Sequence, residues 1–163
     1  MWSTNDSHKG TWKVLPFMNQ GCWVFDVCKR CPKTFQFIES LPNLLDDCLF
    51  GNAMISKISP GTVIEPHCGP TNIRHRLQMA LQIPSKRCEM SLQVSDSRLE
   101  WGKEGDYFVF DDSFIHSVNF TSQPGAHPTA AEERIVLIVD LWHPELTPAE
   151  KCVLQNVYPP SSS

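Results

Sequence analysis

The sequence predicts an all-β core, a sandwich or barrel of antiparallel strands, with short helices at its flanks. Three observations support this prediction: apolar and polar residues alternate in several short runs, turns separate those runs, and thirteen of the 163 residues are proline. Alternation with a period of two is typical of strands that have one buried face. Roughly six to eight such strands, separated by turns, indicate an antiparallel sandwich or barrel.

Length and composition indicate one globular domain. Hydrophobic residues make up 41% of the chain and charged residues 20%, and a chain of this length can bury a single core. We expect residues 22–158 to form the domain and residues 159–163 to be a tail. Residues 1–21 are polar apart from the stretch 12–17, and we expect them to be an irregular segment with little core of its own.

The individual elements follow from local patterns. Residues 32–41 predict a short helix, because a proline suits its first turn and apolar side chains recur on one face. A second helix is predicted after Thr147, where Pro148 and Glu150 complete the pattern of a capping box. The predicted strands cover residues 53–59, 62–64, 76–83, 90–94, 99–101, 107–110, 114–120 and 135–142.

Charge and hydropathy exclude two classes of partner. The formal net charge is −4 and the sequence pI about 5.8, which gives no basic footprint for nucleic acid. No apolar run approaches the roughly 18 to 20 residues that span a bilayer, and residues 1–10 lack the apolar core of a signal peptide. We expect the chain, as it stands, to be soluble.

The seven cysteines cannot all pair within the chain, because their number is odd. Cys28 and Cys31 form a C-x-x-C motif, which alone could be half of a zinc site or a redox pair. A zinc ribbon needs a second such motif, and the sequence has none. We expect most of the five isolated cysteines, which are Cys22, Cys48, Cys68, Cys88 and Cys152, to be buried thiols or halves of structural disulfides.

Two of the six histidines are candidates for chemistry. His67 follows a predicted strand in a rigid, proline-rich loop, and His116 lies inside an apolar strand after the acidic turn at Asp111 and Asp112. Histidines on two strands of one barrel can meet in its interior. The alternative is two unrelated core histidines, each satisfied by a hydrogen bond. His143, at a strand end, is expected to be a structural hydrogen-bonding residue.

Arg134 adds a cation to this pattern, because it opens the apolar strand that ends near residue 142. A guanidinium that faces a barrel interior needs an anionic partner, since an unpaired buried charge is costly. Two histidines followed by an arginine fit non-haem iron together with a dicarboxylate whose far end the arginine holds. The alternative is a salt bridge from Arg134 to Glu132 or Glu133 at the strand edge.

Three stretches together resemble the aspartyl/asparaginyl β-hydroxylase family of Fe(II)- and 2-oxoglutarate-dependent dioxygenases. They are residues 67–76, residues 110–116 and residues 134–148, and the agreement extends from about Cys28 to the C-terminal helix. An insertion before Arg134 makes the short vertebrate members the most similar form. The resemblance implies a double-stranded β-helix, that is, a cupin-like jelly roll with an all-β core.

The resemblance also implies roles for individual residues. The iron ligands of the family correspond to His67 and His116, and the arginine that binds the distal carboxylate of 2-oxoglutarate corresponds to Arg134. Ser56 matches a serine that contacts the same carboxylate, and Arg76 matches an arginine near the proximal carboxylate.

Two further positions complete the implied cosubstrate and substrate contacts. Arg74 corresponds to an arginine that grips the acidic side chain of the substrate. Gln78 stands where a histidine lies near the cosubstrate in a relative, and a glutamine can donate a hydrogen bond there but carries no charge.

The main departure from the wider superfamily is Gly69, which occupies the position of the usual carboxylate ligand. The resemblance implies that two histidines and a water suffice, with weaker retention of iron. Asp111 or Asp112 could reach the metal instead, although turn or supporting roles are preferred.

The implied reaction is hydroxylation of Asp or Asn side chains in a peptide or protein substrate. It consumes O2 and 2-oxoglutarate and releases succinate and CO2. Two alternatives stay open: a pseudoenzyme that keeps the fold and hydroxylates nothing, which Gly69 and Gln78 motivate, and a hydroxylase of a lipid or small molecule.

The family also suggests a location. Its animal members are type II membrane proteins with a lumenal catalytic domain, so we expect the endoplasmic reticulum or Golgi membrane, through an anchor absent from this chain. Asn5 and Asn119 lie in N-x-S/T triplets that glycosylation could use there. The lumen would also permit a disulfide at Cys28 or Cys31.

Overall fold

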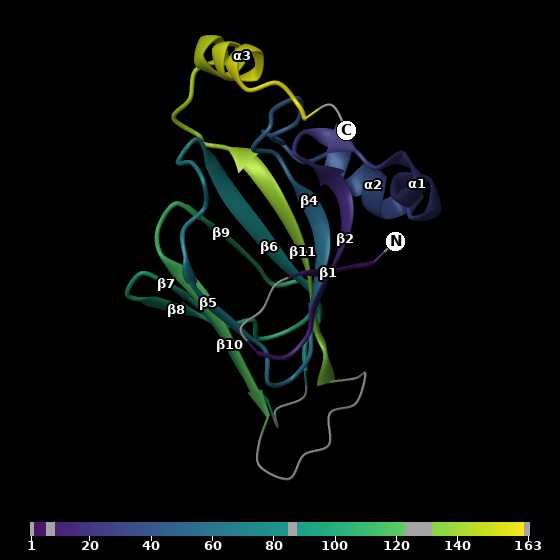
Figure 1. Cartoon of the computed structure of the whole chain (residues 1–163), viewed down its shortest axis with the longest axis vertical. Helices are drawn as coiled ribbons and strands as arrows, with labels where there is room; N and C mark the ends of the chain where they lie inside the picture. Colours follow the sequence, from purple (N-terminus) through teal and green to yellow (C-terminus); the bar gives the residue numbers. More distant parts are fainter. Residues whose placement is uncertain (1, 6–8, 85–87, 123–131, 162–163) are drawn as a thin grey trace.

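Two antiparallel sheets face each other in the computed structural model, which describes residues 2–5, 9–84, 88–122 and 132–161 (Figure 1). The larger sheet has the order β1 (Ser3–Asn5), β2 (Trp12–Asn19), β4 (Ala53–Ile58), β11 (Arg134–Trp142), β6 (Arg74–Gln82) and β9 (Tyr107–Phe110), with β3 (Cys22–Trp23) paired to β2. The smaller sheet has the order β5 (Val63–His67), β10 (His116–Ser122), β7 (Cys88–Val94) and β8 (Ser97–Leu99).

The chain crosses repeatedly from one sheet to the other. β4, β6, β9 and β11 belong to the larger sheet, and β5, β7 and β10, which lie between them in sequence, belong to the smaller one. This alternation is the topology of a jelly roll, so the predicted fold class is confirmed. Its consequence for function is that residues far apart in sequence line a shared interior.

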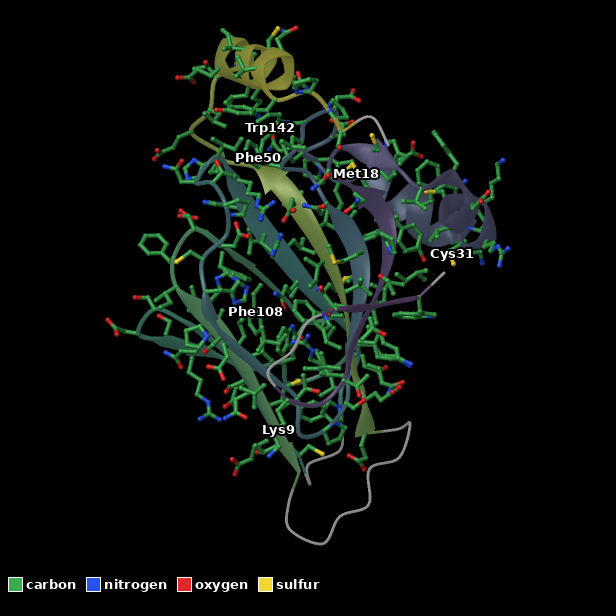
Figure 2. The ribbon with its side chains drawn as sticks, in the orientation of Figure 1. Lys9, Met18, Cys31, Phe50, Phe108 and Trp142 are labelled. Carbon is green, nitrogen blue, oxygen red and sulfur yellow. The ribbon has the colours of Figure 1, made fainter. Side chains whose placement is uncertain are left out.

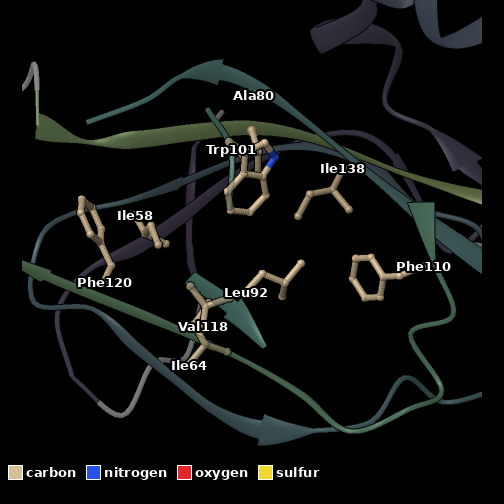
Figure 3. Close-up of a cluster of buried hydrophobic side chains, with 10 residues drawn as sticks. Ile58, Ile64, Ala80, Leu92, Trp101, Phe110, Val118, Phe120 and Ile138 are labelled. Atoms are coloured by element: carbon tan, nitrogen blue, oxygen red, sulfur yellow. The ribbon is translucent and has the colours of Figure 1, made fainter. Parts of the chain in front are cut away.

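β11 separates two cores because both of its faces are covered. Val136 and Ile138 join the cluster between the sheets. Figure 3 shows Ile138 in this cluster with Leu92, Phe110 and Val118. The alternate residues of β11 join a second cluster under the helices α1 (Phe25–Arg30) and α2 (Pro32–Glu39). Figure 2 shows Phe108 between the sheets and Met18 on the side of these helices. We call the two sides of the larger sheet the inner face and the outer face.

Residues 12–19 differ from the irregular segment that was expected. They form β2, which pairs with β4 and buries Leu15, Phe17 and Met18. The register shifts between Pro16 and Met18, so two successive residues are buried there and the period of two is interrupted. A proline cannot donate to the ladder, and such irregularities are typical of its position in a strand.

The predicted helices are confirmed, and one more was missed. α2 begins at Pro32, and α3 (Pro148–Val157) begins after Thr147 with the capping box that the sequence indicates. α1 escaped prediction because it has only six residues and no side-chain cap. Among the described residues, none of the helices combines the length and the apolar character that a bilayer span requires.

The strand predictions are right in place and differ at some ends. β4, β6, β9 and β11 lie within two residues of their predicted bounds. β5, in contrast, continues to His67, which the sequence placed in a loop, and β10 begins only at His116. These two ends coincide because the two strands pair there.

All seven cysteines are free thiols in the structure, with Cys28 and Cys48 buried. Cys28 donates its thiol hydrogen to the carbonyl of Phe17 at 3.6 Å. This places the C-x-x-C motif in the outer-face core. Of the five isolated cysteines only Cys48 is buried and none is in a disulfide, so the expectation that most of them would be buried thiols or halves of disulfides is wrong.

Replacing Phe17 tests whether β2 belongs to the core. Phe17 is fully buried, and we expect Phe17→Ala to lower the free energy of unfolding by about 3–5 kcal/mol, because a large cavity remains. Phe25→Ala is the control, since Phe25 is 61% exposed and surface changes usually stay within about 0.5 kcal/mol. Urea denaturation followed by circular dichroism measures both. Equal effects of the two substitutions would contradict the packing.

Candidate functional site

His67 and His116 face each other across two neighbouring strands. They are directly opposite in the register of β5 and β10, and their ring centroids lie 4.2 Å apart. His116 is buried and also packs against Phe110 of the core between the sheets, while His67 is exposed. The pair therefore joins the interior to the solvent, and the predicted meeting of the two histidines is observed.

Each ring is held by a hydrogen bond that leaves its other nitrogen available. His67 Nδ1 lies 2.8 Å from the carbonyl of Glu65, and His116 Nδ1 lies 2.9 Å from the carbonyl of Phe114. A carbonyl only accepts, so Nδ1 carries the hydrogen and Nε2 of the neutral ring keeps a lone pair. Burial, and then the neighbouring His67, lower the pKa of His116. This is the arrangement of metal-ligating imidazoles.

The carboxylate of Asp112 fills the space beside Gly69. A Cβ atom built on Gly69 would lie 2.5 Å from Asp112 Oδ2, and the Gly69 amide donates to the Asp112 carbonyl at 2.6 Å. A side chain at residue 69 would therefore collide with Asp112. The glycine at the usual ligand position is explained by the presence of a carboxylate that comes from another part of the chain.

Asp112 belongs to a buried network of four charges with Arg74, Arg76 and Asp140. Asp112 Oδ2 lies 2.7 Å from Nη2 of Arg74 and 3.3 Å from Nη1 of Arg76. Asp140 lies 3.0 Å from Arg74 Nη1 and 2.8 Å from Arg76 Nε. Burial alone would raise the pKa of Asp112, but the hydrogen bond from Arg74 and the charges of Arg76 and Arg74 hold it below its usual value. Two cations and two anions thus compensate each other in the interior.

Asp140 and Arg74 also use neutral partners. The backbone and side-chain N–H groups of Asn52 donate to Asp140 Oδ2 at 3.1 and 3.2 Å. Arg74 donates to the carbonyl of Phe50 as well. The predicted contacts of Arg74 with a substrate and of Arg76 with a cosubstrate are not tested by these distances and stay predictions.

Arg134 is a buried cation whose charge is not compensated in this way. Its side chain is only 2% exposed, yet its Nε and Nη1 have no hydrogen-bond partner within the described part of the chain. Its guanidinium carbon lies 5.4 Å from the ring centroid of Trp101. Burial lowers the pKa of Arg134 to about 10, so the group is still charged at neutral pH.

The salt bridge considered as an alternative for Arg134 is absent among the described residues. Glu133 pairs instead with Lys57 at 3.2 Å. Glu132 accepts a hydrogen bond from the Cys88 thiol at 3.2 Å. The guanidinium of Arg134 therefore faces the interior without an anion from these two glutamates, as a binding role requires.

Two further buried polar atoms that lack a hydrogen-bond partner among the described residues lie between the sheets. They are Nε1 of Trp101 and Oε1 of Gln78. Ser56 is also buried, and its hydroxyl oxygen accepts from Trp12 Nε1 at 3.0 Å, which leaves its hydrogen to donate. An indole N–H, a hydroxyl and a guanidinium are donors that suit a carboxylate. Trp101 was missed by sequence reasoning, because its position before a turn carries no signal of function.

A second group of potential ligands lies on the outer face. His75, Asp111 and His143 bring one ligand atom each within 4.8 Å of one another. The ring centroids of His75 and His143 are 4.4 Å apart. Burial, and then His143, lower the pKa of His75, while Asp111 is the first of the neighbouring acids that oppose this shift. The sequence offered only a hydrogen-bonding role for His143, whose Nδ1 accepts from the Glu145 amide at 3.3 Å.

Replacing one acid of the charge network tests its weight in folding. We expect Asp140→Asn to lower the free energy of unfolding by about 3–5 kcal/mol, because two buried guanidinium groups lose an anion. The control is Glu100→Gln, which removes an acid from the exposed pair with Arg98 (2.7 Å) and should cost about 1 kcal/mol or less. Denaturant titrations measure both variants. A loss at Asp140 no larger than at Glu100 would show that the network is not stabilising.

Comparisons with known proteins find relatives with similar sequences. The family model described as aspartyl/asparaginyl beta-hydroxylase matches residues 2–144. The human aspartate beta-hydroxylase domain-containing protein 2 is 40% identical over 98% of this chain and 41% of its own length. The human aspartyl/asparaginyl beta-hydroxylase is 36% identical over 90% of this chain and 18% of its own length. The chain thus spans about two fifths of the length of the first of these.

Solved structures with a similar arrangement have little sequence identity. A predicted oxalate decarboxylase from Thermotoga maritima aligns with a TM-score of 0.49 and 11% identity, over 88% of this chain and 91% of that one. The Cnp3 cupin domain from Schizosaccharomyces pombe aligns with a TM-score of 0.48 and 8% identity, over 86% of this chain and 69% of that one.

Proposed function

The chain belongs to the aspartyl/asparaginyl β-hydroxylase family, and from this premise we propose that it is an Fe(II)- and 2-oxoglutarate-dependent dioxygenase. The proposed reaction hydroxylates Asp or Asn side chains in a peptide or protein. It couples this to oxidative decarboxylation of 2-oxoglutarate, which yields succinate and CO2.

The unpaired guanidinium of Arg134 is the observation that carries the proposal. A buried cation without an anion is costly, so the inner face favours an anionic ligand there. A carboxylate can take two parallel hydrogen bonds from a guanidinium, and Nε and Nη1 of Arg134 are unused. Trp101 and Ser56 supply further donors to the same carboxylate. The distal end of 2-oxoglutarate suits this position.

His67 and His116 are the proposed metal ligands. Their Nε2 atoms are available, and the hydrogen bonds from Nδ1 keep both rings in one orientation. Fe(II) bound there would supply the chemistry that uses O2 and the keto acid to hydroxylate a C–H bond. Asp112 lies at Gly69 with its charge already balanced by two arginines. We propose that it supports the metal site from outside the ligand set.

Arg76, Gln78 and Arg74 are proposed for the other end of the cosubstrate and for the substrate. Arg76 keeps 16% of its side chain exposed, which supports a contact near the proximal carboxylate. The unpartnered Oε1 of Gln78 is an acceptor, so a contact of Gln78 with a carboxylate would have to use its side-chain N–H. Arg74 is only 3% exposed. A substrate carboxylate must therefore compete with Asp112 and Asp140 for this guanidinium.

The rim beside His116 supports a polypeptide substrate. Phe114 and Ile115 immediately precede His116, and their side chains are 58% and 54% exposed. Large apolar groups at the mouth of a site are typical of surfaces that bind partners.

We also propose a lumenal location in the secretory pathway, on the basis of the family and of Asn119, whose side chain is exposed.

A pseudoenzyme is the second candidate, because Gly69 and Gln78 depart from the residues expected there. It shares the binding site and differs only in turnover. Binding and turnover must therefore be measured separately.

Arg134→Met tests the cosubstrate site through stability. Removing an unpaired buried charge at nearly constant volume should leave the ligand-free protein as stable as before, or more stable by about 1–4 kcal/mol. The same change should abolish the rise in melting temperature that 2-oxoglutarate gives the parent protein. Differential scanning fluorimetry measures both effects, with Arg98→Met at the exposed pair as control. An undiminished 2-oxoglutarate shift in the variant would refute the assignment.

His67→Ala tests turnover. His67 is exposed, so the variant should fold, and we expect succinate release in the presence of iron, 2-oxoglutarate and Asp- or Asn-containing peptides to fall at least about a hundredfold. Lipid extracts assayed in parallel distinguish the substrate classes. If the parent protein binds iron and 2-oxoglutarate but releases no succinate with any substrate, the pseudoenzyme is favoured.

A further inference from the structure

We propose that His75, Asp111 and His143 form a second metal site, selective for Zn2+ or a similar divalent transition-metal ion, on the outer face of the larger sheet. This proposal goes beyond the dioxygenase site and does not depend on it. It rests on the placement of three ligating side chains by three adjacent strands.

The register of β11, β6 and β9 determines where the three residues meet. His75 is opposite Leu141 in the pairing of β6 with β11, and His143 follows two residues later. Arg76 is opposite Phe110 in the pairing of β6 with β9, and Asp111 follows directly. The His143 amide also donates to the carbonyl of Ile73 at 2.8 Å. The ligands are thus held at one end of a rigid sheet.

The donor set suits a transition metal. Two imidazole nitrogens and one carboxylate oxygen are typical of three-residue zinc sites that keep a fourth position for water. Their ligand atoms lie within 4.8 Å of one another, and the two rings are tilted by 74°. Zinc bonds of about 2.0–2.2 Å require these atoms to approach further. Rotation of partly exposed side chains allows this, because the His143 contact to the Glu145 amide is long at 3.3 Å.

The surroundings admit a hydrated cation. Asp111 and His143 line a hollow of about 360 Å³, together with Asn72, Glu145 and Glu150. Glu150 is engaged at the start of α3, where its carboxylate accepts from the Thr147 amide at 2.8 Å. Glu145 acts on His75 through its charge. Acidic groups around an open hollow favour entry of a divalent ion.

The site is separate from the pair His67 and His116. Arg74 and Arg76 on β6 point to the inner face, where they meet Asp112 and Asp140. His75 lies between them in sequence and therefore points to the opposite face. Asp111 and Asp112 divide in the same way, since the first lies with His75 and the second with Arg74. A metal at His75 would not reach the ligand of Arg134.

Metal stoichiometry in matched variants tests the proposal. Isothermal titration with Zn2+ alone should give one bound ion for His67→Ala, a variant in which the proposed dioxygenase site lacks a ligand. In the His67→Ala background, His75→Gln should lower the affinity for the bound ion by at least about a hundredfold. Loss of a residue that only supports a ligand typically lowers metal affinity by about 10–100-fold, and loss of the ligand itself should cost more. Asp111→Asn is a second variant with the same expected loss. Circular dichroism without metal checks that each variant is folded.

Cobalt gives an independent readout of the same site. Co2+ added to His67→Ala should produce the visible absorption of a site with nitrogen and oxygen ligands, and His75→Gln in that background should abolish it. If His67→Ala binds no ion, or if His75→Gln and Asp111→Asn leave its affinity unchanged, the second site is refuted. These metal-binding measurements do not depend on succinate release. Failure of the second metal site can therefore be distinguished from failure of the proposed dioxygenase function.

Discussion

The pairing register of β6 with β11, at the centre of the larger sheet, is the constraint on which the rest of the structure depends. It places Arg76 opposite Asp140 and Gln78 opposite Ile138, and it directs all four of these side chains to the inner face. Because side chains alternate along a strand, a slip of one residue in β11 would move Arg134 and Asp140 to the outer face. The charge network, the inward placement of Arg134 and the grouping of His75 with Asp111 and His143 would then be lost together. Desolvation opposes such a slip, because it would bury the charges of Arg134 and Asp140 in the apolar core under α1 and α2.

The interior contains two kinds of buried charge. Charges with partners in the chain stabilise the fold, and a charge without such a partner favours binding of a ligand. Arg74 and Arg76 share two aspartates, so their desolvation is compensated within the chain. Arg134, by contrast, lies over the face of Trp101 and has two donors, Nε and Nη1, with no hydrogen-bond partner in the described part of the chain. The first arrangement holds the end of the sheet beside the histidines. The second costs the folded protein stability, and an anion bound at Arg134 would return that free energy.

The sequence predicts elements correctly where residue type and hydrophobic period agree. It does not predict contacts between residues that are far apart in the sequence. The alternation of β6 indicates a strand of the predicted fold, and an arginine at the start of the apolar β11 singles out Arg134. The irregularity at Pro16 interrupted the period of β2 and hid a core strand. Gly69 was visible in the sequence, but the carboxylate that fills its space comes from Asp112, through a contact that no local pattern encodes. The same is true of His75, which acquires its neighbours only when three strands pair.

Charge on the inner face explains why metal and cosubstrate should bind as a pair. Arg74, Arg76 and Arg134 against Asp112 and Asp140 leave an excess of one positive charge in the folded protein. A divalent metal bound alone would raise this excess to three, and a dicarboxylate bound alone would reverse it. Both together restore the original balance, so each ligand lowers the electrostatic cost of binding the other in a medium of low dielectric. Under the proposed function, two neutral histidines would therefore suffice as protein ligands, because the cosubstrate would bring its own negative charge and Arg134 would hold its far end.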